Sequence, residues 1–223
     1  MLYYTLGLTL AALVLLIVQP RHEENRWASF FLLCAAIGGL IDLIGRLIPE
    51  SQWMLVMLNH TLTPYGVLVF SIVYTKRPRS ARVRRRLKAI LLLPAAMMWV
   101  QVWMNMQHLI DYRLLLIWTA PYYLISCVLL MHAWHGETHP VRKRSRLITA
   151  MLMIPTLLAV LFFINVGNAI SPGYDFFPYV SGFMIYSLAA AVLSTFVYGV
   201  LGIRFRIERE SLEHTLQAVS TST

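Results

Sequence analysis

The chain has 223 residues, of which 58% are apolar and only 13% carry a formal charge, and its net charge is +9. A soluble domain of this length is usually about half apolar and about a quarter charged, so the composition excludes an ordinary soluble domain and indicates a membrane protein. The Lys and Arg residues stand between the apolar runs, which is typical of topogenic charge beside lipid headgroups rather than of a nucleic-acid partner.

Seven apolar runs are long enough to cross a bilayer, which requires roughly 20 residues in a helix. Each run is continuous rather than alternating, and backbone groups in hydrocarbon must be hydrogen-bonded within their own segment, so the runs predict helices rather than a barrel. The expected fold class is therefore all-α, a polytopic bundle of seven transmembrane helices. In chain order the predicted spans are residues 1–18, 27–44, 54–74, 89–106, 114–131, 147–166 and 176–203.

The distribution of Lys and Arg predicts the orientation of the bundle. With seven spans, seventeen of the nineteen cations fall on one side, and cytoplasmic loops carry such an excess because cationic segments translocate poorly. The amino terminus is therefore expected outside and the carboxyl end in the cytoplasm, with only Arg46 and Arg113 on the outer side. The first run lacks a preceding basic region and a clear cleavage site, so we expect it to stay as a helix.

Polar residues inside the spans gather toward the predicted outer half. Such side chains are costly in lipid and tend to face the bundle interior or a watery cavity. Asp42 and Arg46 are four residues apart, so a structural ion pair is the first interpretation of the two. For His60 both a satisfied core histidine and a ligand contact stay open. The candidate residues of an outward-facing ligand pocket are Asp42, Arg46, Asn59, His60, Thr63, Gln101, Asn105, Tyr122, Asn165 and Tyr179.

Four spans contain a proline, which removes a backbone donor and clashes with the preceding turn of a helix. These helices are expected to kink or unwind locally, either for packing within the bundle or to form a cavity or hinge. The four residues are Pro64, Pro94, Pro121 and Pro155.

No motif in the chain indicates catalysis, since it contains no P-loop, no G-x-S-x-G elbow and no kinase glycine loop. Three histidines and a glutamate crowd the inner loop at 132–139, but their spacing matches no strong zinc pattern. Cys34 and Cys127 each lie in an apolar span, where a thiol behaves as a small hydrophobe. We therefore expect neither a metal nor a cofactor.

The last span continues without a proline into residues 204–223, which predicts a helix that leaves the membrane. Apolar residues repeat there at seven-residue spacing, with Glu and Arg between them, a short pattern that suits packing against a partner helix. The residues of this predicted signalling helix are Phe205, Leu212, Leu216 and Val219.

The stretch 53–74, with Thr-Pro-Tyr at 63–65 and Phe-Ser-Ile-Val-Tyr at 70–74, and the exit at 199–219 resemble a known family. They are similar to the seven-transmembrane sensor region at the amino-terminal end of bacterial sensor histidine kinases. The resemblance covers nearly the whole chain and implies a sensor domain at 1–203, followed by the start of a cytoplasmic dimerisation helix at 204–223. His214 lacks the acidic neighbour of a phosphoaccepting histidine, so the acceptor is expected beyond residue 223.

The resemblance implies a sensory input domain in a bacterial inner membrane. A small ligand, a peptide or a signal from the lipid would act on the outer pocket of a homodimer, and the seventh helix would pass it to a kinase core and its response regulator. Two alternatives stay open. A small transporter or channel requires polar groups that continue through the inner half, and a membrane scaffold only anchors a partner protein.

Overall fold

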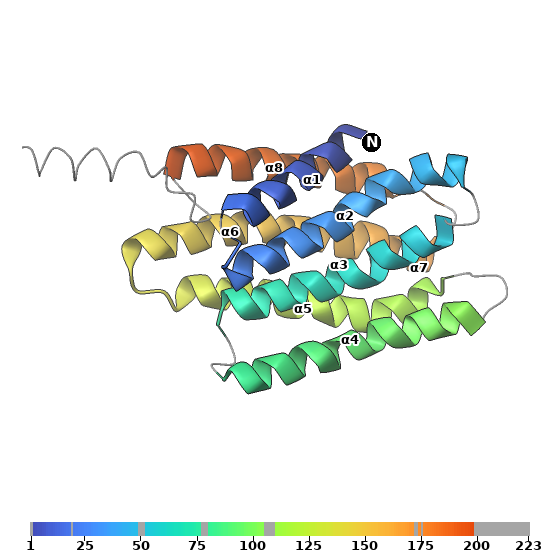
Figure 1. The fold of residues 1–223 in the computed structure, drawn as a ribbon, viewed down its shortest axis with the longest axis horizontal. Coiled ribbons are helices and arrows are strands. Elements are labelled where there is room, and N and C mark those ends of the chain that lie inside the picture. Colours follow the sequence, from blue (N-terminus) through green and yellow to red (C-terminus); the bar gives the residue numbers. More distant parts are fainter. Residues whose placement is uncertain are drawn as a thin grey trace, which may run out of the picture.

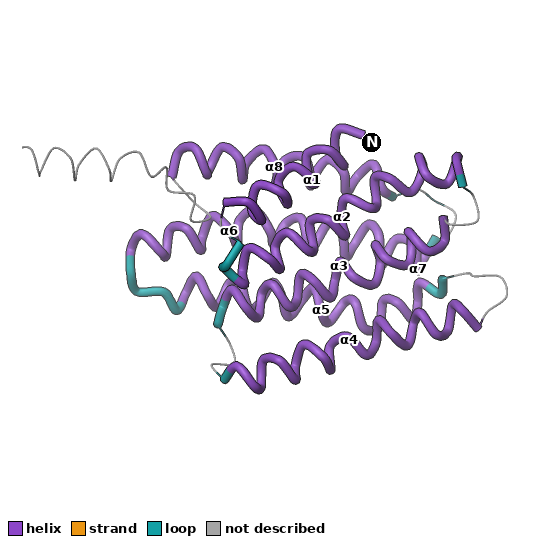
Figure 2. Tube along the Cα trace, in the orientation of Figure 1, coloured by secondary structure: helices purple, strands orange, loops and turns teal. Residues whose placement is uncertain are grey.

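The computed structural model describes residues 2–18, 20–48, 52–76, 80–104, 110–171, 174 and 176–198. Every element in this part of the chain is helical, and the helices lie lengthwise beside one another (Figures 1 and 2). Their bounds are α1 Leu2–Val18, α2 Glu23–Leu47, α3 Gln52–Tyr74, α4 Ala81–Met104, α5 Tyr112–His135, α6 Pro140–Ala159, η2 Val160–Val166, α7 Gly167–Ile170 and α8 Phe177–Tyr198.

The elements α6, η2 and α7 follow one another without a break, so the described residues form seven helical rods. This arrangement confirms the predicted all-α, seven-helix class. By length and composition, four rods among the described residues are apolar enough to cross a membrane, and α1 holds a shorter apolar segment at Thr5–Ile17. The four long candidates are Gln52–Tyr74, Ala81–Met104, Tyr112–His135 and Pro140–Ile170.

Six of the rods form a closed ring, and α4 lies outside it. In order, α1 packs on α2, α2 on α3, α3 on α5, α5 on α6, α6 on α8, and α8 again on α1. The outer helix α4 packs against α3 and lies at the edge of the bundle (Figure 1). Two hydroxyl groups also hold it there, because Tyr65 and Tyr122 donate to the carbonyls of Lys88 and Leu91 at 3.3 and 2.8 Å.

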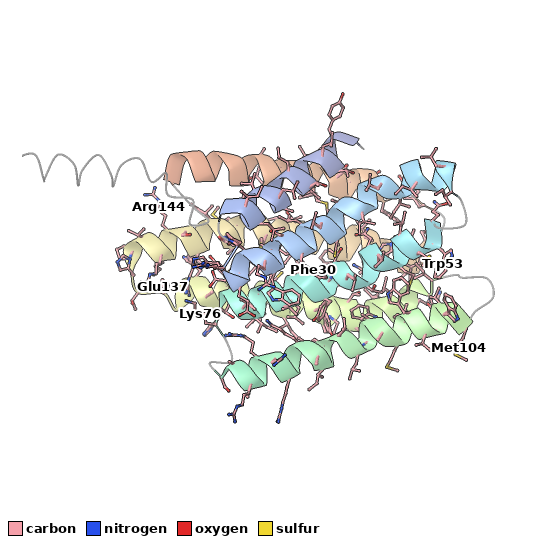
Figure 3. The ribbon with its side chains drawn as sticks, in the orientation of Figure 1. Phe30, Trp53, Lys76, Met104, Glu137 and Arg144 are labelled. Atoms are coloured by element: carbon pink, nitrogen blue, oxygen red, sulfur yellow. The ribbon has the colours of Figure 1, made fainter. Side chains whose placement is uncertain are left out.

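The two ends of the bundle differ in their side chains. Figure 3 places Lys76, Glu137 and Arg144 at one end, which we call the cation-rich end, and Trp53 and Met104 at the other, which we call the Trp53 end. The loops between α3 and α4 and between α5 and α6 meet the cation-rich end. These are the loops that the sequence assigns to the cytoplasmic side.

Helices α2 and α3 approach each other closely at Gly66. A Cβ atom at this position would lie 2.9 Å from Cδ1 of Phe30 and 2.9 Å from Cβ of Phe31, both on α2. A hydrogen at Cα is therefore what allows the two backbones to pack at this distance, as small residues do in many membrane bundles.

The four prolines lie inside helices α3, α4, α5 and α6, as the sequence predicts. After Pro155 the chain changes from α-helix to the wider π-helix η2. Near the same proline, the Ser187 hydroxyl of α8 donates to the Leu152 carbonyl at 3.0 Å and contacts the Thr156 hydroxyl. Serine and threonine side chains commonly compensate a helix backbone that proline has disturbed, and here they also tie α6 to α8.

Candidate functional site

A cavity of about 220 Å³ lies inside the ring, in the half of α3 that begins beside Trp53. Its lining has two parts, one polar and one mostly apolar. The polar wall comes from α3, from the first residue of α5 and from η2 and α7, and consists of Asn59, His60, Thr63, Tyr112, Asn165 and Asn168. The rest of the lining, half of it from α2 and α8, consists of Ala35, Gly38, Ile41, Val56, Tyr123, Val160, Ile164, Phe176, Val180 and Met184.

The α3 part of the polar wall occupies the turn that precedes Pro64. Thr63 Oγ1 donates to Asn59 Oδ1 at 3.1 Å, which fixes the orientation of the amide. The His60 ring packs edge-on against the Tyr112 ring, with 5.6 Å between ring centroids. Proline has no N–H, so the His60 carbonyl lacks the usual donor four residues later. Pro64 thus leaves the backbone carbonyl of His60, a residue that lines the cavity, without its usual helical donor.

The π-helix η2 supplies Asn165, which is only 3% exposed. Its Oδ1 accepts from Thr119 Oγ1 of α5 at 3.2 Å, and its Nδ2 donates to the Val160 carbonyl at 3.4 Å. Asn168 lies three residues further along the same rod and therefore on a neighbouring part of its face. The π turn, which often occurs at functional sites, shifts this face relative to a continuous α-helix.

Several polar groups in the cavity have no hydrogen-bond partner within the described part of the chain. These are the Asn59 Nδ2 amide, the ring nitrogens of His60, the side-chain amide of Asn168 and the Tyr112 hydroxyl. These four side chains are half-buried and line the cavity, where water or a ligand can satisfy their polar groups. The polar wall therefore offers both donors and acceptors to whatever fills the cavity.

Four of the pocket candidates named from the sequence meet at this cavity, namely Asn59, His60, Thr63 and Asn165. Three others lie elsewhere in the structure. Tyr122 is buried between α5 and α4 with its hydroxyl on the Leu91 carbonyl, and Gln101 is exposed on α4, outside the ring. Tyr179 is exposed and its ring stacks on Phe163. Its hydroxyl lies 3.1 Å from the Tyr174 hydroxyl.

The remaining candidates fall outside what the structure describes. The helix α2 includes Asp42 and Arg46, but their side chains are not among those described. The other predicted residues beyond the described ranges are Asn105, Phe205, Leu212, Leu216 and Val219.

Sequence reasoning did not select two of the polar residues that line the cavity, Tyr112 and Asn168. Tyr112 is the first residue of α5, where an aromatic side chain reads most simply as part of an interfacial belt. Asn168 follows Asn165 by three residues, a spacing that does place both on one helical face. This three-residue spacing was the sequence feature that could have identified Asn168 as a neighbour of Asn165.

A second cavity, of about 650 Å³, opens at the cation-rich end and is lined by acidic and basic side chains together. Glu23 lies 3.2 Å from Arg84 and also pairs with Lys88, whose hydrogen bond holds the pKa of Glu23 below its ordinary value of 4.5. Burial raises the pKa of the neighbouring Glu24. Lys88 also lies 4.9 Å from the centre of the Trp27 ring. These contacts tie α2 to α4 and neutralise much of the local charge.

Within the described ranges no three His, Cys, Asp or Glu side chains gather in a way that could hold a metal ion. In the 132–139 loop, His135 Nδ1 lies 2.9 Å from the Met131 carbonyl, and Glu137 pairs with Arg146 at 3.1 Å. Two of these side chains, His135 in the last turn of α5 and Glu137 in the loop after it, therefore have local structural partners.

A helical bundle with four membrane-span candidates among its described residues, three of them in a ring around a small cavity, defines a polytopic helical membrane protein with a candidate ligand site. The model of one family, the N-terminal 7TM region of histidine kinase, matches residues 2–201. The match covers most of the chain, so the protein belongs to this family and is the seven-transmembrane sensor region of a histidine kinase. Comparison with curated proteins finds no match, and comparison with solved structures finds none either.

Proposed function

We propose that the cavity receives the signal and that α8 carries it to a kinase core in the cytoplasm. Val180 and Met184 of α8 line the cavity directly, so whatever fills the cavity contacts the last helix of the bundle. This contact is the observation on which the proposal rests. A ligand can shift an equilibrium between two positions of α8 only through its different affinity for them, and direct contact supplies such a difference.

In the proposed orientation the cation-rich end faces the cytoplasm of a bacterial inner membrane, and the Trp53 end faces outside. The excess of Lys and Arg in the loops of the cation-rich end supports this orientation. The helix that the sequence predicts at residues 204–223 would then pair with its copy in a homodimer through Phe205, Leu212, Leu216 and Val219. A response regulator would receive the phosphoryl group from the downstream core.

The interior of the ring supports a sensor rather than a channel. Toward the cation-rich end the helices pack around an apolar cluster that includes Val67, Phe70, Leu130 and Leu157, and the buried Ser71 and Ser126 donate to carbonyls of their own helices. A conducting route would need polar groups in this stretch. A closed apolar core instead suits a bundle in which helices shift against each other.

The proposal can be tested in a histidine kinase that carries this chain at its amino-terminal end, reconstituted in liposomes. Val180 is 1% exposed and faces the cavity, whereas Ile185 on the same helix is 53% exposed. Val180→Phe should change basal autophosphorylation at least about fivefold, because filling the cavity biases the position of α8 by about 1 kcal/mol or more. The matched Ile185→Phe should stay within about twofold.

A second filling variant, Ala35→Leu, approaches the cavity from α2 and guards against a local folding defect at α8. Circular dichroism melting in the same lipid reports whether each variant folds. Equal autophosphorylation in folded Val180→Phe, Ala35→Leu and Ile185→Phe proteins would refute the role of the cavity.

A further inference from the structure

The two-sided lining of the cavity indicates the chemistry of its occupant, an inference that rests on the function proposed above. We propose that the cavity binds an uncharged amphipathic molecule of about ten non-hydrogen atoms. Its hydrogen-bonding end lies against the polar wall, and its apolar body lies against α2 and α8.

The size of the occupant follows from the volume of the cavity. An apolar protein cavity of about 150 Å³ holds one benzene ring. The present cavity, at about 220 Å³, has room for a ring with a short substituent but not for a peptide or a lipid chain. The occupant is therefore a small molecule.

The polar end of the occupant follows from the groups left without partners. Asn59 Nδ2 can donate, and the side-chain amide of Asn168 can both donate and accept. The Tyr112 hydroxyl and the His60 ring add one further donor and acceptor each. An occupant with no hydrogen-bonding group would displace water from these half-buried groups without replacing its hydrogen bonds, which costs free energy.

The described lining residues favour an uncharged occupant. No Asp, Glu, Lys or Arg is among the described residues that line the cavity. An ion placed there would lose its hydration and gain no opposite charge from that lining. Amides and a hydroxyl suit a neutral group such as a carboxamide, a ketone or an alcohol.

The apolar body faces the helices that would transmit the signal. Ala35 and Gly38 on α2 and Val180 and Met184 on α8 provide a surface without polar side-chain atoms other than the Met184 sulfur. Because contact energy at this wall depends on shape, a body that fits one position of α8 better than another selects that position.

Four ring compounds of similar size test the proposal: benzamide, benzoate, benzylammonium and ethylbenzene. Each is titrated against the purified chain in lipid nanodiscs and followed by saturation-transfer NMR, with empty nanodiscs to subtract partition into lipid. Benzamide should bind at least about tenfold more tightly than the two ions and ethylbenzene. Asn168→Leu should weaken benzamide about fivefold, since one hydrogen-bonding group is lost. Val180→Phe should abolish binding, and Ile185→Phe should leave it unchanged.

Each alternative result overturns part or all of the proposal. Benzoate or benzylammonium binding within about twofold of benzamide would overturn the uncharged class. Equal binding of ethylbenzene would overturn the polar end, and no saturable benzamide binding would overturn the whole proposal. If Val180→Phe fails to fold, the Asn168→Leu titration still decides.

Binding with these preferences but no difference between Val180→Phe and Ile185→Phe in autophosphorylation would leave the ligand class standing and refute the signalling role. A difference between these two variants in autophosphorylation without the expected binding preferences would leave the signalling role standing and refute the ligand class.

Discussion

The contact between α6 and α8 at Ser187 is a sharp test of how α8 is held to the bundle. The Ser187 hydroxyl donates to the Leu152 carbonyl at 3.0 Å and also contacts Thr156. Hydrogen bonds between membrane helices contribute about 0.6 kcal/mol on average and up to about 1.7 kcal/mol. Thr156 Oγ1 donates to the same carbonyl at 3.0 Å, so Ser187→Ala leaves that carbonyl satisfied. The substitution should therefore lower the free energy of unfolding by about 1 kcal/mol and not more than about 2 kcal/mol.

The measurement is reversible unfolding in mixed micelles by titration with sodium dodecyl sulfate, followed by circular dichroism. Ser126→Ala is the control, because it removes the same hydroxyl group from a serine that is fully buried and donates to the Tyr122 carbonyl of its own helix, at 2.7 Å. The control should change the free energy of unfolding by less than about 0.5 kcal/mol. Equal losses in the two variants would show that the contact between α6 and α8 adds no stability.

Two further substitutions test other parts of the bundle. Glu23→Gln should lower the free energy of unfolding by about 0.5 to 1 kcal/mol at neutral pH, a modest loss because Glu23 is 41% exposed. The folded pKa of Glu23 lies below its ordinary value, so its contribution to the free energy of unfolding is complete above about pH 5 and disappears as the pH falls through the folded pKa. At such low pH, wild type and variant should unfold alike. A difference in stability that does not change with pH would contradict the pairing with Lys88. Gly66→Ala should destabilise by about 1 to 2 kcal/mol because its Cβ meets Phe30 at 2.9 Å, whereas Gly182→Ala, with nothing within 4 Å, should not destabilise; similar losses in both would refute close packing of α2 on α3.

The number and type of helices could be predicted from the sequence because each span is a continuous apolar run bounded by charges or turns. The sequence also predicts one common depth for Asn59, His60, Thr63 and Asn165, and these four residues line one cavity in the structure. The rotation of each helix about its axis, which decides the side chains that face the interior of the ring, could not be predicted from the sequence. The apolar residues of α4 surround the helix on all sides, so nothing in the sequence shows that Gln101 lies outside the ring.

Contacts between distant segments were the other part that sequence patterns could not supply. The change from α-helix to π-helix after Pro155 alters which side chains face the cavity, and proline alone does not predict it. The pairing of Glu23 with Arg84 and Lys88 depends on α2 and α4 meeting at one end. Charge counting identifies the cations as topogenic but does not identify their partners.

The central claim requires the cation-rich end, where α8 would deliver the signal, to face the cytoplasm. Cysteine accessibility tests it most directly in a variant whose buried thiols, Cys34 and Cys127, are replaced by alanine. Single cysteines are then placed at the exposed positions Gln52, at the Trp53 end, and Lys143, at the cation-rich end. A membrane-impermeant maleimide should label Gln52→Cys in intact cells and Lys143→Cys only after permeabilisation. Labelling of Lys143→Cys in intact cells would contradict the account.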